Sequence, residues 1–147
     1  MIKKYLLTVL ILLILSKLIY ADDNAIVVIA NRNSGIQVLS HTELVNIYLG
    51  RTKKLASGVT VTPIDLPINS DEKKLFYQQL VHKSPAEIQA YWARLVFTGQ
   101  ANQPVEIDNA QDILKMIQKN QNTIAYINRK NINSSVIIVH ELSRNLN

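Results

Sequence analysis

The chain of 147 residues contains no cysteine, only four glycines and few charged side chains. Without cysteine there is no disulfide scaffold, no thiolate metal site and no site for a lipoprotein anchor. The four glycines are scattered, so no glycine-rich loop of the kind that cradles nucleotide phosphates is present. No serine stands in a Gly-x-Ser-x-Gly elbow, and no pair of carboxylates shares a hydrophobic setting. An enzyme is therefore disfavoured, and neither catalytic residues nor a cofactor are predicted.

The first 21 residues have the layout of a secretory signal peptide. Met1–Ala21 carries three lysines and no acidic residue, and its segment Tyr5–Leu15 is almost entirely apolar. That segment has 11 residues, fewer than the ~20 needed to cross a bilayer. We predict cleavage after Ala21 and export of a soluble protein to the periplasm. An uncleaved N-terminal anchor is the alternative.

Residues 22–147 carry little net charge once this leader is set aside. They hold 13 lysines and arginines against 11 aspartates and glutamates, a balance of +2. Nucleic acid is disfavoured as a partner, because so small a net positive charge gives little affinity for phosphate backbones. The 126 residues have the size of one domain. We predict a signal peptide at 1–21 and a single domain at 22–147.

Strands and helices alternate along the predicted domain. A β-branched apolar run at Ala25–Ala30 predicts a strand buried on both faces. Ser40–Glu43 and Ser84–Glu87 are capping boxes that start helices. Further strands are predicted at 59–64, 123–127 and 136–140, and further helices after a cap at Asn69 or Ser70 and at 110–120. The alternation predicts an α/β fold of three layers, with a mixed sheet flanked by helices.

The core is predicted from apolar residues at helical spacing. An aromatic stripe on a helix is more often core than the lining of a ligand pocket. On this ground we place in the core Leu75, Phe76, Leu80, Tyr91, Trp92 and Phe97.

The three histidines show no metal-ligand spacing along the chain. His41, His82 and His140 fall near the ends of predicted elements. We therefore predict three surface imidazoles and no metal site.

The predicted helix N-termini are the only candidate ligand sites in the sequence. They present free backbone N–H groups and a partial positive charge, which together can bind an anion. Asn33-Ser34-Gly35 follows the first predicted strand, and Asn69-Ser70 precedes the helix after the second. Hydroxyl, amide and backbone N–H donors suit a phosphate-sized anion. The candidate oxyanion ligands are Ser34, Gly35, Asn69 and Ser70. The alternative is that these residues form ordinary caps and turns.

Several segments resemble a short, single-lobe group of exported proteins similar to the substrate-binding proteins of phosphate ABC transporters. The segments are Leu44–Arg51, Val61–Pro67, Phe76-Tyr77, Ala90–Gly99 and Thr123–Ile127, and the match runs from about Val27 to Val139. The resemblance implies the fold of one lobe of a type II periplasmic binding protein. It also implies phosphate or a similar oxyanion as the ligand and an inner-membrane permease as a partner.

Two functions are left open. The first is an exported solute-binding protein that holds an oxyanion non-covalently at the Asn69-Ser70 helix start, with help from Ser34 and Gly35. The second is a ligand-free interaction module of the periplasm that has kept the lobe and lost the anion. Because 126 residues make one lobe only, a second copy of the chain or another lobe-bearing protein would complete the ligand site.

Overall fold

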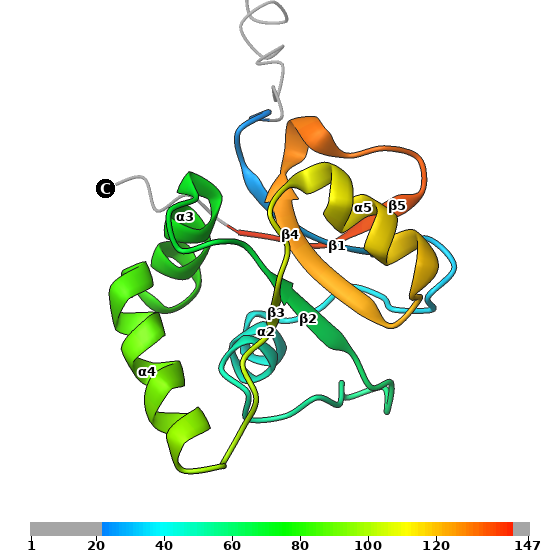
Figure 1. Ribbon diagram of the computed structural model, residues 1–147. Coiled ribbons are helices and arrows are strands. Elements are labelled where there is room, and N and C mark those ends of the chain that lie inside the picture. Colours follow the sequence, from blue (N-terminus) through cyan, green and yellow to red (C-terminus); the bar gives the residue numbers. More distant parts are fainter. Residues whose placement is uncertain (1–21, 143–147) are drawn as a thin grey trace, which may run out of the picture.

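The computed structural model describes residues 22–142 (Figure 1). The predicted signal peptide lies outside these residues and stays a prediction. Within the described range, no helix is both long enough and apolar enough to cross a membrane. In chain order the elements are β1 (Ile26–Asn31), α2 (His41–Tyr48), β2 (Thr62–Asp65), α3 (Asp71–Val81), α4 (Pro85–Phe97), β3 (Val105–Glu106), α5 (Ala110–Lys119), β4 (Thr123–Asn128), a 3₁₀ turn (Arg129–Asn131) and β5 (Val136–Glu141).

The strands form one mixed sheet in the order β3-β2-β4-β1-β5. Strand β1 runs antiparallel to both of its neighbours, β4 and β5, whereas β2 runs parallel to β3 and β4. All six residues of β1 are buried, which confirms the strand predicted from its β-branched run. The sheet also confirms the predicted α/β class.

Helices cover both faces of the sheet, which makes three layers (Figure 1). On one face, the ring of Tyr126 in β4 stacks on Phe76 of α3 with centroids 3.8 Å apart. On the other face, the buried Asn31 side chain donates to the Ile117 carbonyl of α5 over 2.9 Å. Helix α2 shares the first face, because Tyr48 also contacts Phe76 and Tyr126. The predicted three-layer arrangement is confirmed.

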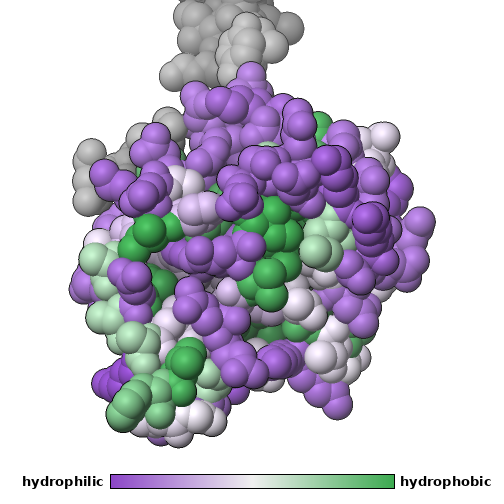
Figure 2. Space-filling view, in the orientation of Figure 1, coloured by the Kyte–Doolittle hydropathy of each residue, from purple (hydrophilic) through white to green (hydrophobic). Residues whose placement is uncertain are grey.

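Two predicted core residues lie at the surface. Phe97 is 92% exposed at the end of α4, and Leu75 is 42% exposed on α3. Helix α3 buries Lys73 and Tyr77 instead of Leu75, so its inward face is rotated from the one that apolar residues alone predict. Figure 2 shows the resulting hydrophobic surface at lower left, over the end of α4. Phe76, Leu80 and Trp92 are buried as predicted.

Gly50 follows α2, at a position that requires both a left-handed backbone conformation and the absence of a side chain. Its φ is +68°, which disfavours any residue with a Cβ, and an added Cβ would lie 2.5 Å from Cη2 of Trp92. We expect Gly50→Ala to lower the free energy of unfolding by about 1–3 kcal/mol, as strain and overpacking together predict. Urea denaturation measures this change. Gly35→Ala is the matched control, because Gly35 has a similar φ but no atom lies within 4 Å of a Cβ added there. An equal loss of stability in the two variants would show that the contact with Trp92 is unimportant.

Candidate functional site

A small cavity lies at the carboxyl ends of the parallel strands. Its volume is about 190 Å³, and it is bounded by the residues that follow β2, β3 and β4. Ligand sites of open α/β sheets form at this edge, where loops leave the strands and helices begin. The lining residues are Leu66, Ser70, Glu72, Asp108, Asn109, Ala110, Ile127, Asn128 and Asn131. We call this the strand-end cavity.

Two helix N-termini point their first turns at the strand-end cavity. Ser70 caps α3 by accepting a hydrogen bond from the Lys73 amide over 3.1 Å. Asn109 caps α5 by accepting one from the Asp112 amide over 3.0 Å. The remaining first-turn amides have no acceptor within their own helix, and the two helix dipoles add positive potential at the cavity. This is a site that favours hydrogen-bond acceptors.

The predicted ligand residues are divided between opposite ends of the sheet. Ser70 lines the strand-end cavity, and Asn69 is exposed immediately before it. Ser34 and Gly35 follow β1, which runs antiparallel to β4 and therefore ends beside the start of β4. Gly35 lines a different cavity, together with residues of the 37–39 and 55–57 segments. The structure therefore does not bring Ser34 and Gly35 to Ser70.

The charge around the strand-end cavity is negative. Glu72 and Asp108 contribute carboxylates to its lining, which contains no lysine or arginine. One oxygen of Glu72 accepts a hydrogen bond of 2.7 Å from the Asn128 side chain, which fixes the carboxylate at the wall. The helix dipoles of α3 and α5 attract an anion, whereas the carboxylates of Glu72 and Asp108 repel it. An anion that carries a proton can donate it to a carboxylate in a hydrogen bond, so it suits the cavity better than a fully ionised anion.

A buried charged cluster supports the turn that carries Ser70. Asp65, at the end of β2, is fully buried and lies 3.1 Å from Nζ of Lys73, which is itself 2.9 Å from a Glu106 oxygen. The hydroxyls of Tyr77 and Tyr126 both donate to the Asp65 carboxylate. Asp65 is enclosed in the core with these donors around its carboxylate, and it is not among the residues that line the strand-end cavity.

Both tyrosines of this cluster remain protonated donors. Burial raises the pKa of the Tyr77 hydroxyl well above its usual value, and the adjacent Asp65 charge raises it further. The pKa of Tyr126 is raised by the same two causes in the same order. Sequence reasoning did not find this cluster, because Asp65, Lys73 and Tyr126 come from three separate elements.

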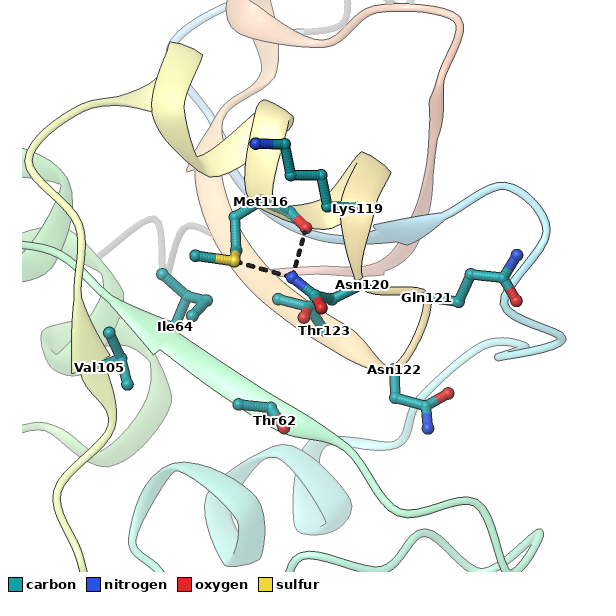
Figure 3. A pocket seen from close by; sticks show the side chains of 9 residues that line it. All are labelled: Thr62, Ile64, Val105, Met116, Lys119, Asn120, Gln121, Asn122 and Thr123. Carbon is teal, nitrogen blue, oxygen red and sulfur yellow. Dashed lines mark hydrogen bonds between the residues drawn. The ribbon is translucent and has the colours of Figure 1, made fainter.

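A larger cavity of about 620 Å³ opens at the other end of the sheet, between α5 and the starts of β2 and β4 (Figure 3). Lys119 is the one cation among its lining residues. The Asn120 amide is already engaged, since it donates to the carbonyl and sulfur of Met116. Gln121 and Asn122 extend outward in Figure 3. This cavity lies at the amino ends of the strands, away from the helix N-termini, and contains none of the predicted ligand residues.

No protein-family model matches the chain, and no curated protein is similar to it in sequence at a significant level. Solved structures do match its fold. An ABC-type phosphate transport receptor from Vibrio cholerae is 11% identical with a TM-score of 0.62, and the match covers 78% of this chain and 45% of the receptor.

Two further solved structures agree with this match. A putative phosphate ABC transporter substrate-binding protein from Clostridium perfringens, solved with bound phosphate, is 18% identical with a TM-score of 0.61 and coverages of 78% and 44%. PstS from Borrelia burgdorferi is 14% identical with a TM-score of 0.53 and coverages of 70% and 40%. The chain therefore spans less than half the length of these proteins. It has the fold of a single lobe of the phosphate ABC transporter substrate-binding proteins, as its sequence resemblance implied.

Proposed function

We propose that the protein is an exported solute-binding lobe that binds phosphate, or a similar protonated oxyanion, non-covalently in the strand-end cavity. The observation that carries the proposal is the position of this cavity between the N-termini of α3 and α5. Ser70 supplies a hydroxyl at the cavity, and the first-turn amides supply N–H donors. The solved proteins of the same fold bind or transport phosphate by description, which agrees with this assignment.

Phosphate fits the charges of the cavity better than sulfate does. Phosphate keeps at least one proton near pH 7, so it can donate a hydrogen bond to a carboxylate while its other oxygens accept from amides. Sulfate has no proton to donate, and Glu72 and Asp108 repel it. Because a single lobe leaves the ligand open to water, we expect weak binding, with a Kd on the order of 1 mM.

Calorimetric titration of the purified protein tests this proposal. Phosphate should give saturable heat and sulfate should not. Ser70→Asp should weaken phosphate binding by about tenfold or more, because it places a third carboxylate in the cavity, while aspartate still caps α3. Glu72→Gln should narrow the difference in affinity between phosphate and sulfate. The amide oxygen of glutamine can still accept the hydrogen bond from Asn128, but the side chain no longer repels the anion.

Ser34→Asp is the matched control for Ser70→Asp. It adds the same charge at the opposite end of the sheet, so phosphate affinity should stay close to that of the unmodified protein. Equal loss in both variants would assign the effect to overall charge. The absence of saturable heat with millimolar phosphate would reject the proposal.

The second candidate is the ligand-free interaction module. The observation that favours it is the pair of carboxylates in the strand-end cavity, with no cation in the lining to balance them. A stable protein partner recovered by pull-down, together with no heat from phosphate, would select this function.

A further inference from the structure

Two histidines that are 99 positions apart in the sequence lie side by side on the surface. The ring centroids of His41 and His140 are 6.3 Å apart, and the rings are tilted by 50°. The sequence showed no metal-ligand spacing, because His41 starts α2 and His140 belongs to β5. The two rings are brought together by the fold and not by their spacing along the chain.

Backbone contacts hold this pair in place. The Leu39 amide donates to the Val139 carbonyl over 2.8 Å, which attaches the segment before α2 to the edge of β5. The Leu39 carbonyl lies 2.7 Å from Nδ1 of His140. Since His41 follows two residues later at the start of α2, these two contacts hold its backbone near His140.

The contact with Leu39 also sets which nitrogen of His140 can bind a ligand. A carbonyl oxygen only accepts, so Nδ1 must carry the proton that it receives. The neutral ring then has its lone pair on Nε2. A histidine whose second nitrogen donates to a backbone carbonyl is the usual arrangement for a metal ligand, since the hydrogen bond fixes both the tautomer and the ring.

The separation of the two rings is within reach of a shared metal ion. A metal–N bond of about 2.0–2.1 Å places a ring centroid roughly 3.2 Å from the metal. Two rings on one ion are therefore about 5.2 Å apart at the tetrahedral angle and about 6.4 Å apart when the two metal–N bonds are collinear. The observed 6.3 Å lies just below the collinear limit, so a bent geometry requires the exposed His41 side chain to rotate toward His140 by about 1 Å. We propose that His41 and His140 form a two-histidine site for a divalent transition-metal ion, with Cu²⁺ bound more tightly than Zn²⁺.

The remaining coordination positions belong to water or to a small ligand. No group of three or more histidine, cysteine or acidic side chains suited to a metal occurs within residues 22–142. A site with two protein ligands is open and exchangeable, in contrast to a closed structural site with four. Neither histidine lines the strand-end cavity, so this proposal stands independently of phosphate binding.

Competition titration with Cu²⁺ and Zn²⁺ against a weak chelator tests the site. The protein should bind one Cu²⁺, and the electron paramagnetic resonance spectrum should show coupling to imidazole nitrogen. His41→Ala removes one ligand at an exposed position. His140→Asn removes the other and keeps an amide that can donate to the Leu39 carbonyl. Each variant should weaken Cu²⁺ binding by about tenfold or more.

His82→Asn is the matched control, because asparagine tolerates the positive φ of 55° that His82 has at the end of α3. It should leave Cu²⁺ affinity and the spectrum unchanged. The proposal is overturned if neither His41→Ala nor His140→Asn weakens binding. It is also overturned if His82→Asn weakens it equally, or if the bound Cu²⁺ shows no imidazole coupling.

Discussion

Trp92→Ala should lower the free energy of unfolding by about 3–5 kcal/mol, the usual loss for a large aromatic side chain in a core. Trp92 is 1% exposed, and its six-membered ring packs against Gly50. It also meets Tyr91 edge to face with centroids 5.6 Å apart. Its removal leaves a cavity between α2 and α4 that the surrounding backbone cannot close. Urea denaturation monitored by circular dichroism measures the loss.

Trp92→Phe provides the control for this truncation. The indole nitrogen is buried with no hydrogen-bond acceptor in the described structure, so phenylalanine removes volume but no hydrogen bond. We expect the phenylalanine variant to be clearly more stable than the alanine variant. If Trp92→Ala lost less than about 1 kcal/mol, Trp92 would not be the core residue that its burial indicates.

Lys73→Met should be about as destabilising, with an expected loss of roughly 3–5 kcal/mol. The ammonium group of Lys73 is the cation that balances the fully buried Asp65, and it also pairs with Glu106. Methionine preserves most of the side-chain volume, so the loss reports an uncompensated buried carboxylate rather than a cavity. The Tyr77 and Tyr126 hydroxyls would still donate to Asp65 but would supply no positive charge.

Lys74→Met is the matched control, since Lys74 is the exposed neighbour on the same helix. It should change stability by no more than about 0.5 kcal/mol. Adding Asp65→Asn to Lys73→Met should recover part of the loss, because the charge left unpaired is then removed. Equal stability of the Lys73 and Lys74 variants would show that the buried pair makes no net contribution.

Local features of the fold could be predicted because their signals lie close together in the sequence. Both predicted capping boxes are present, with Ser40 and Glu43, and Ser84 and Glu87, in reciprocal hydrogen bonds. Strand β1 is buried as its β-branched run predicted. Strand β3 was not predicted, because its two residues, Val105 and Glu106, are too short a segment for any periodic pattern.

The ligand site could be predicted only in part, because its geometry depends on strand direction. Ser34 and Ser70 each follow a predicted strand, so sequence reasoning alone could not tell which end of the sheet each of them occupies. The antiparallel pairing of β1 with β4 separates them, while the parallel pairing of β2 with β4 brings Ser70 to the strand-end cavity. The same kind of long-range pairing places His41 beside His140, which no spacing along the chain could indicate.

The proposed oxyanion site lies at the carboxyl ends of the parallel strands. Chemical-shift mapping of the ¹⁵N-labelled protein during a phosphate titration tests it most directly. We predict saturable shifts for backbone amides at the starts of α3 and α5, around Ser70 and Asn109, with little change around Ser34 and Gly35. Shifts confined to the Ser34 region, or no saturable shifts at millimolar phosphate, would contradict the account.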